Sequence, residues 1–503
     1  MTLQESIGIN GSASGKVLLY AFLNASFESG FTNPMDEAIR DCRGIDISPY
    51  RKIGEIPYDF VRKRLTVLLE ASGSALMVTK GAVERVLSVC SMAEDSDGKM
   101  LQLAQVKEDL HRRYREISSQ GFRLLGVACK KFEKLERLSG DLEADMVFLG
   151  FLVFFDPPKK GVLQAVNTLE DLGINFKMIT GDNRFVAAHV SRQIGLEHPL
   201  VLTGQAILKM SDEALTRKVN DVDVFAEVEP NQKERIVLAL KKAGNVVGYM
   251  GDGINDASAL HAADAGVSVD TALAVVKDAA DIVLLEKGLD VLASGVQEGR
   301  NIFANTLKYV MISTSANFGN MFSMACVSPF LPFLPLLPKQ ILLNNLLTDI
   351  PAMAIADDRV DPEMVARPRR WDISQIRRFM VIFGLQSSLF DLLTFAVLLY
   401  VLHAAAGEFR TGWFLESAIS EILILLVIRT RRPFFRSLPG RYLSLAGLVM
   451  VATAVVFVLP PLGEFMGFDT IPGIYAAALL AILGLYVATA ELTKKIFFRT
   501  STG

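Results

Sequence analysis

Residues Met250–Leu260 read MGDGINDASAL, and this stretch decides the fold class of the chain. The apolar run NVVGYM before Gly251 predicts a buried strand, and the residues from Asp256 onward predict the beginning of a helix. A strand, a glycine-flanked turn and a helix form the repeating unit of a parallel α/β sheet, whose ligands bind where the strands end. We therefore expect Asp252 and Asp256 to lie at the carboxyl end of such a strand.

Asp252 and Asp256 are candidate ligands for Mg2+. A hard divalent cation prefers carboxylate and phosphate oxygens, and the glycines on both sides of Asp252 leave room for a ligand there. An Asp-Gly pair by itself more often marks a tight turn before a helix. The complete string favours the metal-binding interpretation over the turn.

Two further motifs carry groups that bind phosphate. Residues Lys177–Asn183 read KMITGDN, so that Thr180, Gly181 and Asp182 follow a predicted strand, where a hydroxyl and a flexible backbone can hydrogen-bond a phosphoryl oxygen. Lys233 lies on a later predicted helix and can neutralise phosphoryl charge. A β-turn and a surface lysine are the simpler interpretations of these residues. Their order along the chain, with the threonine first, the lysine next and the two aspartates last, favours catalysis.

The composition indicates a chain with a soluble half and a membrane half. Of its 503 residues 51% are hydrophobic and 21% are charged, and long apolar segments begin only beyond Phe303. The net charge of −3 indicates no dedicated nucleic-acid surface. The four cysteines lack metal-type spacing and the first residues lack a secretory signal, so we expect the soluble half to be cytosolic.

Three regions follow one another along the chain. Residues 1–143 mix strands and helices and predict an α+β domain. Residues 144–300 alternate apolar strands with helices, beginning with the run Met146–Asp156, and predict a doubly wound parallel sheet. Residues 301–503 predict six transmembrane helices, since each apolar segment approaches the roughly 20 residues that span a bilayer. The predicted spans are Asn305–Val327, Pro332–Ala356, Phe379–His403, Gly412–Ile428, Leu443–Leu459 and Ile474–Ala490.

Loop charge predicts the orientation of these spans. Arginines are concentrated in segments 359–378 and 429–441, and basic residues also follow the last span. Because such loops stay on the cytoplasmic side, both chain ends are expected in the cytoplasm of a cell whose inner membrane holds the spans.

Polar residues inside the first two spans are candidate ligands for a transported cation. Asn317 and Asn320 lie three positions apart, and Asn345, Thr348 and Asp349 share one helix face. Burying such groups in hydrocarbon is costly, so they are expected to face one another or an ion. A structural hydrogen-bond network between helices is the alternative. Pro351 is expected to break the second span and free carbonyl oxygens, and Glu416 and Glu421 are weaker candidates.

The motif order resembles the later motifs of the haloacid-dehalogenase superfamily, and the complete strings resemble P-type ATPases. The matching strings are Lys80-Gly81-Ala82, Asp156-Pro157-Pro158, Thr180-Gly181-Asp182 and GDGINDASAL. The resemblance implies an ATP-binding domain inserted into a haloacid-dehalogenase-like domain, with Mg2+ as cofactor. It also implies nucleotide-binding roles for Phe60, Lys80, Gly81, Arg123 and Asp156, with Arg62 or Arg64 assisting. The first two of these side chains would sandwich the adenine.

The runs NFGNMFS, LPFLPLLP, RPRRWDI and GWFLESAISE look most like bacterial magnesium-transporting P-type ATPases. This resemblance implies ATP-driven import of Mg2+ through an aspartyl-phosphate intermediate, although Thr348-Asp349-Ile350-Pro351 is closer to other cation pumps and leaves Ca2+ or H+ open.

The phosphorylated aspartate of the family lies in an Asp-Lys-Thr-Gly-Thr turn, and no such string occurs in this sequence. We therefore expect this sequence to lack the actuator domain, four helices and that aspartate, which a truncated gene, an internal start or a split gene with a separate amino-terminal half would each explain. A membrane-anchored ATP-binding or regulatory protein without turnover is the main alternative. A phosphatase fused to a membrane anchor is the third, but Asp156 is its only candidate nucleophile and the prolines that follow do not form the required loop.

Overall fold

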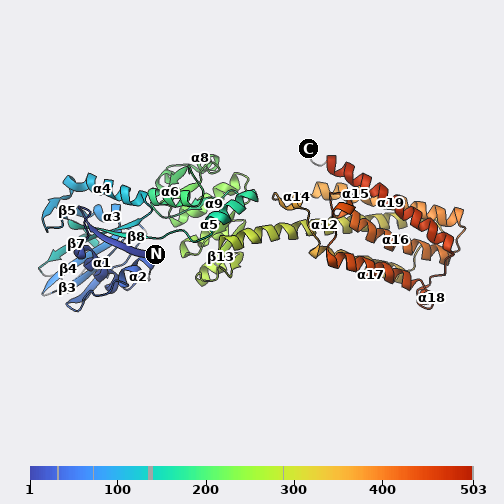
Figure 1. The fold of residues 1–503 in the computed structure, drawn as a ribbon, viewed down its shortest axis with the longest axis horizontal. Helices are drawn as coiled ribbons and strands as arrows, with labels where there is room; N and C mark the ends of the chain where they lie inside the picture. Colours follow the sequence, from blue (N-terminus) through green and yellow to red (C-terminus); the bar gives the residue numbers. More distant parts are fainter. Residues whose placement is uncertain (31–32, 60, 72, 134–139, 287, 501–503) are drawn as a thin grey trace. The chain divides into compact units, whose positions relative to one another are not determined.

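The computed structural model describes residues 1–30, 33–59, 61–71, 73–133, 140–286 and 288–500. The chain divides into two compact units, an amino-terminal unit, Met1–Leu292, and a helical unit, Ala293–Gly503 (Figure 1). Phe60, one of the predicted adenine-binding residues, lies outside the described residues.

An eight-stranded sheet forms the first part of the amino-terminal unit. Seven of its strands run in the order β2-β3-β4-β7-β8-β5-β6, and β1 pairs with β8. Helices pack on this sheet and bury apolar side chains between them, as the α+β prediction requires. The strands are β1 Thr2–Gly8, β2 Tyr50–Ile56, β3 Arg64–Ala71, β4 Ser74–Ala82, β5 Cys90–Glu94, β6 Met100–Gln102, β7 Arg123–Phe132 and β8 Met146–Phe155; the helices are α1 Gly15–Phe27, α2 Pro34–Arg40, α3 Val83–Leu87 and α4 Leu103–Ser119.

Strand β8 differs from the sequence prediction. The run that contains it was expected to open the parallel sheet, but β8 pairs antiparallel with β7 and β1 and parallel with β5 in the first sheet. Its side chains from Phe148 to Phe154 are buried, because both faces of this central strand are covered. A strand buried on both faces reads as a continuous apolar run, which is also the signature of a parallel α/β strand.

Parallel strands occur in the second part of the same unit, in two separate sheets of three strands rather than in one sheet. The orders are β10-β11-β9 and β12-β13-β14. The strands are β9 Met178–Ile179, β10 Val201–Thr203, β11 Val224–Ala226, β12 Gly248–Met250, β13 Ala265–Val269 and β14 Ile282–Leu284; the helices are α5 Val162–Asp171, α6 Arg184–Gln193, α7 Gly204–Leu208, α8 Asp212–Lys218, α9 Pro230–Lys242, α10 Ala257–Ala262 and α11 Ala274–Asp278.

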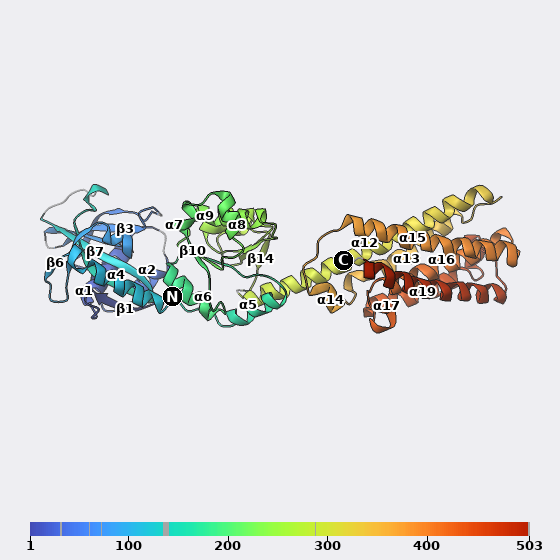
Figure 2. The same ribbon diagram turned by 90° about the horizontal axis from the view of Figure 1, so that it is seen from above.

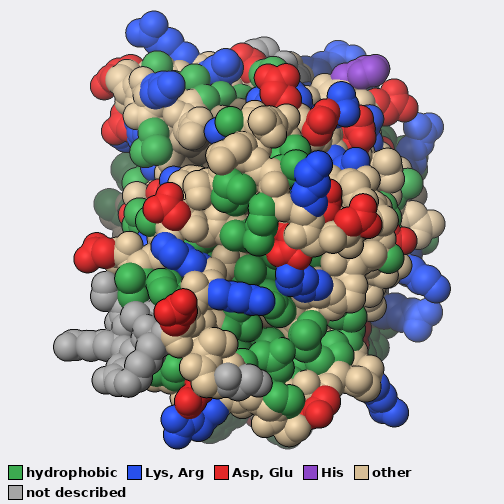
Figure 3. Space-filling view, turned by 90° about the vertical axis from the view of Figure 1, so that its left-hand side faces the viewer, with side chains coloured by type: hydrophobic (Ala, Val, Ile, Leu, Met, Phe, Trp, Pro, Cys, Tyr) green, Lys and Arg blue, Asp and Glu red, His purple; other side chains and the backbone are tan. Residues whose placement is uncertain are grey.

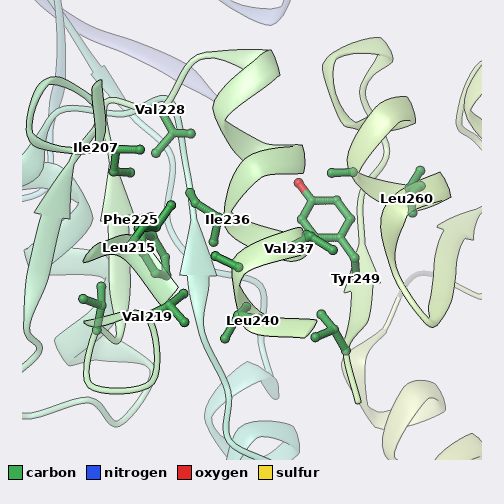
Figure 4. Packing of buried hydrophobic residues seen from close by; sticks show 14 of the residues in the cluster. Ile207, Leu215, Val219, Phe225, Val228, Ile236, Val237, Leu240, Tyr249 and Leu260 are labelled. Carbon is green, nitrogen blue, oxygen red and sulfur yellow. The ribbon is translucent and has the colours of Figure 1, made fainter. Parts of the chain in front are cut away.

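Helix α9 joins these two parallel sheets through one hydrophobic core. Ile236, Val237 and Leu240 of α9 lie between Phe225 of β11 on one side and Tyr249 of β12 on the other (Figure 4). The helix begins with Pro230 at its first position, and the backbone N–H of Glu229 donates to Oε1 of Gln232 at 2.9 Å, which fixes where it starts. The packing of α9 therefore sets the position of every side chain that it carries toward the strand ends.

The two parts of the amino-terminal unit meet where the carboxyl-terminal end of α4 contacts α6 (Figures 1 and 2). Asn183 caps α6 by accepting from the backbone of Phe185 and Val186, and its amide donates to Ser118 of α4 at 3.3 Å. Nδ1 of His189 lies 3.1 Å from the carbonyl oxygen of Ser119. Asn183 thus caps α6 and also binds the end of α4.

One face of the amino-terminal unit is drawn in Figure 3. Basic and acidic side chains are interspersed over it, with hydrophobic side chains between them. A mixture of both signs gives a solvated surface without a strong field of one sign.

Six helices of the helical unit match the predicted spans in order. They are α12 Leu289–Val327, α13 Pro338–Met353, α15 Ile373–Ala396 with a π turn to Val401, α16 Ala406–Ile428, α17 Arg441–Phe457 and α19 Gly473–Thr500; short helices are α14 Pro362–Val365 and α18 Leu462–Met466. By length and apolar composition alone, the described residues contain three helices that can cross a membrane, Ile373–Val401, Ala406–Ile428 and Gly473–Arg499. Helix α16 packs against α13, α15, α17 and α19 and is the central helix of the unit (Figure 2).

Helix α13 is shorter than its predicted span and does not break where Pro351 was expected to break it. The helix continues through this proline to Met353, and a 3-10 turn, Ala354–Asp357, follows. Proline in the last turn of a helix removes a single backbone hydrogen bond, so the helix can still close its final turn around it. The predicted cation ligands of α13 therefore lie on a continuous helix.

Candidate catalytic, nucleotide and cation sites

The GDGIND turn connects β12 to α10 at the end of the second parallel sheet. After Gly251, Asp252 and Gly253, a 3-10 turn covers Ile254–Asp256. A side-chain carbon at Gly251 would lie 2.5 Å from Cβ of Asp256, so only glycine allows this turn to fold back so tightly. Asp252 is exposed and Asp256 is buried.

Asp256 lies in a small network of charged and polar groups. Nζ of Lys233 on α9 donates to Oδ1 of Asp256 at 2.7 Å, and the hydroxyl of Tyr249 donates to the same oxygen at 2.5 Å. Burial and the neighbouring Asp256 carboxylate raise the pKa of Tyr249, so the phenol stays protonated and remains a donor. The structure thus brings two of the predicted residues, Lys233 and Asp256, into direct contact.

The donor set of this turn fits Mg2+. Oδ1 of Asp256 accepts both hydrogen bonds, while Oδ2 faces the two glycines of the turn, on the side of the exposed Asp252. Two carboxylates without further acidic neighbours suit a cation that takes its remaining oxygens from phosphate and water. In agreement, the described residues contain no group of three His, Cys, Asp or Glu side chains that would hold a metal alone.

Thr180 and Gly181 follow β9 at the end of the other parallel sheet. The backbone N–H of Thr180 donates to the carbonyl of Phe225 at 2.9 Å, and its Oγ1 accepts from the N–H of Asp182 at 3.1 Å. A side-chain carbon at Gly181 would have only the Val228 carbonyl oxygen within 4 Å, at 3.8 Å. The turn therefore leaves open space beside the threonine.

Arg123 links three segments of the amino-terminal unit. It opens β7, and its guanidinium donates to Asp156, which follows β8, and to Oδ2 of Asp182 at 2.8 Å. Burial acts to lower the pKa of Arg123, but Asp182 and Asp156 raise it above its usual value, so the side chain is a permanent cation. One predicted arginine thus holds together two predicted aspartates from two different motifs.

Lys80 occupies a different environment. Its ammonium is buried on β4 and paired with the buried carboxylate of Asp36. Burial and the neighbouring Asp36 together raise the pKa of Glu28 to about 7, against the lowering effect of Lys80. At the next residue, a side-chain carbon at Gly81 would lie 2.4 Å from the carbonyl oxygen of Lys63, so glycine is required where β4 passes this loop. The predicted assisting arginines Arg62 and Arg64 are both bound to the buried Glu143, at 2.8 and 2.9 Å.

A cavity of about 100 Å³ in the helical unit brings together four of the five predicted cation ligands. Its polar lining comes from α12, α13 and α16 and comprises Ser313, Asn317, Asn345, Thr348, Asp349 and Glu421. The fifth predicted ligand, Asn320, lines an adjoining cavity of about 20 Å³ that also reaches Glu421. Nδ2 of Asn320 lies 3.4 Å from Oε2 of that glutamate.

Tyr249 and Glu421 are the residues that sequence reasoning missed or ranked low. The tyrosine stands two positions before the glycine turn, where it reads as an ordinary apolar strand residue. The glutamate lies on α16, far along the sequence from the other ligands, so only the packing of α16 against α13 reveals its proximity.

Known proteins resemble this chain along its whole length. A family model described as P-type ATPase, cytoplasmic domain N, matches residues 15–161; one described as haloacid dehalogenase-like hydrolase matches residues 93–264; and one described as cation transporting ATPase, C-terminus, matches residues 333–496. A "Magnesium-transporting ATPase, P-type 1" of Escherichia coli is 39% identical over 99% of this chain, and so is a protein of the same description from Salmonella typhimurium. A "Calcium-transporting ATPase 1" of Bacillus cereus is 31% identical over 72% of the chain. The chain spans 57% of the length of the two magnesium-transporting relatives and 41% of the calcium-transporting one.

Proposed function

This chain carries the domains of a P-type ATPase, and we propose that it supplies the nucleotide-binding, phosphoryl-handling and cation-binding parts of an ATP-driven magnesium transporter. The observation that carries the proposal is the cavity lined by Asn317, Asn345, Thr348 and Asp349 together with Glu421. A carboxylate-bearing cavity among membrane helices is costly unless it binds something. The magnesium-transporting description of relatives at 39% identity supports the choice of ion.

The chemistry of this cavity suits a partly hydrated Mg2+. Its polar side chains are amides, hydroxyls and two carboxylates, all oxygen donors. Mg2+ gives up its water reluctantly, and a cavity of about 100 Å³ has room for several waters, since one water needs only about 10–15 Å³ of such space. A dehydrated Ca2+ needs six to eight direct oxygen ligands.

At the strand ends, each residue has a separate task. Asp252 and Asp256 would hold Mg2+, which supplies Lewis-acid activation of a phosphoryl group when it is bound with ATP. Lys233 holds the carboxylate of Asp256 in place through its 2.7 Å contact, and Tyr249 orients the same carboxylate. Thr180 offers a hydroxyl beside an open backbone turn, where it can donate to a phosphoryl oxygen.

Nucleotide binding is assigned to Lys80 and Arg123. Arg123 carries a guanidinium suited to phosphate, and in this structure its two terminal nitrogens donate to Asp156 and Asp182 while its buried Nε has no hydrogen-bond partner among the described residues. ATP phosphates would compete with these carboxylates for the same guanidinium. The assignment of Lys80 to the base of the nucleotide rests on the resemblance of Lys80-Gly81-Ala82 to the P-type ATPase motif, and a bound base would have to compete with Asp36 for this buried ammonium.

We also propose that a separate segment supplies the aspartate that accepts the phosphoryl group, and that the helical unit lies in the cell membrane with both chain ends in the cytoplasm. The arginine-rich segments 359–378 and 429–441 support that orientation. Covalent transfer to an aspartate would divide transfer and hydrolysis into two steps.

Nucleotide affinity tests the first assignment. Arg123→Gln and Lys80→Ala should each weaken binding of a fluorescent ATP analogue to the detergent-solubilised chain by about tenfold, or roughly 1.4 kcal/mol. Arg51→Gln is the matched control, because Arg51 is an exposed arginine of the same sheet paired with Glu70. Equal affinities for all three variants would assign Lys80 and Arg123 to packing.

Ion dependence tests the transport assignment. In the chain joined to a segment that carries the phosphorylated aspartate, Asp349→Asn should raise the Mg2+ concentration for half-maximal transport by about tenfold or more, since it removes a charged ligand. ATP affinity should stay unchanged, and the exposed Asp357→Asn should behave as wild type. Transport of Ca2+ with no Mg2+ transport would contradict the choice of ion. ATP binding without any turnover would favour a regulatory ATP-binding protein.

A further inference from the structure

Glu143 is a buried carboxylate that neither the proposed phosphoryl site nor the cation cavity uses. Its side chain is 1% exposed and lies just before β8. Arg62 donates to its two oxygens at 2.9 and 2.8 Å, Nε of Arg64 donates to Oε2 at 2.9 Å, and the hydroxyl of Thr66 donates to Oε1 at 2.5 Å. A buried carboxylate is stable only when donors compensate its charge. All of these donors come from one segment that is distant in sequence, so Glu143 ties that segment down.

The guanidinium of Arg62 connects Glu143 to the loop of residues 57–63. Nη1 donates to Glu143, Nη2 donates to the carbonyl oxygen of Pro57 at 2.6 Å, and Nε donates to the carboxylate of Asp59. Each of its three nitrogens therefore has an acceptor inside the protein. Because the guanidinium is planar and its N–H groups point in fixed directions, these contacts set the orientation of the loop as well as its distance from Glu143.

The same loop is folded on itself and lies against the end of β4. The carboxylate of Asp59 accepts from the backbone N–H of Arg62 at 2.9 Å, and its carbonyl oxygen accepts from the N–H of Lys63 at 2.8 Å. The carbonyl oxygen of Lys63 accepts from the N–H of Ala82 at 2.9 Å. A side-chain carbon at Gly81 would lie 2.4 Å from that oxygen, so the loop crosses the strand within contact distance. The position of the loop is thereby coupled to the end of β4.

We propose that Glu143 is a positioning residue of the nucleotide-binding site and that it acts through Arg62, which holds loop 57–63 beside Lys80. Lys80 directly precedes the residues of β4 on which the loop rests. The inference deepens the proposed function and rests on its assignment of Lys80 to the base of ATP. By sequence the loop also includes Phe60, the other predicted base contact, which lies outside the described residues. A loop that is already in place spares ATP the cost of ordering it.

The proposal assigns Arg62 to the base side of the nucleotide and leaves the phosphates to Arg123. Inorganic tripolyphosphate carries the phosphates of ATP without the base, so it separates the two roles. Both compounds would compete with a fluorescent ATP analogue for the detergent-solubilised chain. Glu143→Gln and Arg62→Lys should each weaken ATP binding by about tenfold and change the affinity for tripolyphosphate by less than about twofold. Arg123→Gln should weaken both. Equal losses for ATP and tripolyphosphate in the Glu143 and Arg62 variants would place Arg62 at the phosphates and overturn the proposal.

A double variant tests whether Glu143 acts through Arg62. Glu143→Gln combined with Arg62→Lys should bind ATP no more weakly than the weaker of the two single variants, whereas independent contributions would add. Glu70→Gln is the matched control, since Glu70 pairs with the exposed Arg51 on the same sheet, and its ATP affinity should equal that of wild type. Additive losses, or wild-type affinity in both single variants, would contradict the positioning role. The Arg62 side chain is 26% exposed, so Arg62→Lys tests the proposal even where Glu143→Gln does not fold.

Hydrogen exchange of the nucleotide-free full chain, followed by mass spectrometry, tests the loop without ATP. The N–H groups of Arg62 and Lys63 are bonded to Asp59, and their exchange should be about tenfold faster in Glu143→Gln than in wild type or in Glu70→Gln. Unchanged exchange would refute the proposal whatever nucleotide the chain binds. Faster exchange in a chain whose wild type binds no ATP would support the hold of Glu143 on the loop and contradict the nucleotide assignment, so the two failures are distinguishable.

Discussion

At the scale of single residues, the chemistry of the site depends on which atoms already have partners. The aspartates of the GDGIND string were predicted as equivalent ligands, yet Asp252 is exposed while Asp256 shares one oxygen between Lys233 and Tyr249. Motif spacing predicts that such residues meet at a strand end, because parallel strands end on the same side of a sheet. It cannot predict the tyrosine, since nothing in an apolar run indicates which hydroxyl will reach a carboxylate.

The contact between Lys233 and Asp256 should matter for stability as well as for catalysis. Lys233→Ala leaves a mostly buried carboxylate without its cation and should cost about 2–3 kcal/mol in unfolding free energy. Lys241→Ala on the same helix is the control, because its partner Asp264 is about one-third exposed, and this loss should stay near 1 kcal/mol or below. Thermal unfolding of the purified variants compares them. Similar losses for the two lysines would show that Asp256 is solvated.

At the scale of helices and strands, sequence periodicity predicted which residues share a helix face, but the sequence did not predict which strands pair. The offsets of three and four between Asn345, Thr348 and Asp349 predicted a shared helix face, and all three line one cavity. Strand β8 was predicted as a strand but assigned to the wrong sheet. A continuous apolar run indicates that both faces of a strand are buried, but it does not indicate which strands pair with it. Which helices pack against one another is likewise decided by tertiary structure, so the sequence pattern did not predict it.

Helices α12 and α15 approach closely through small residues, and enlarging one of them should separate the pair. A side-chain carbon at Gly384 of α15 would lie 2.5 Å from Phe318 and 3.1 Å from the carbonyl oxygen of Ser315. Gly384→Leu should therefore destabilise the helical unit by about 1–3 kcal/mol through overpacking. Gly484→Leu on α19 has nothing within 4 Å and should be neutral. The apparent melting temperature in detergent, followed by size-exclusion chromatography, measures both. A neutral Gly384→Leu would mean that the helices are not in contact at this point.

At the scale of the whole molecule, the two units have separate hydrophobic cores. Among the described residues, the clusters of the amino-terminal unit end at Leu284, and those of the helical unit begin at Leu307. The change in composition near Phe303 predicted this division, because a chain of apolar spans and a chain of α/β units cannot share one core. Each unit also contains its own proposed ligand site, the strand-end turns in one and the polar cavity in the other.

Separate cores with separate ligand sites should give two thermal transitions that respond to different ligands. ATP with Mg2+ should stabilise only the amino-terminal unit. At an ATP concentration of 100 times the dissociation constant, its unfolding free energy should rise by about 2.7 kcal/mol, and its transition temperature should rise accordingly. Lys80→Ala should reduce that shift and leave the other transition unchanged, since Lys80 lies on β4 of the first sheet. Conversely, Asp349→Asn should alter only the response of the helical unit to added Mg2+, because Asp349 belongs to the cavity between α12, α13 and α16. Differential scanning calorimetry in detergent, with single-ligand and double-ligand scans, resolves the two responses. If ATP raised both transitions equally in the wild-type chain, the two units would unfold as one, and their separate cores would not act as independent cooperative units.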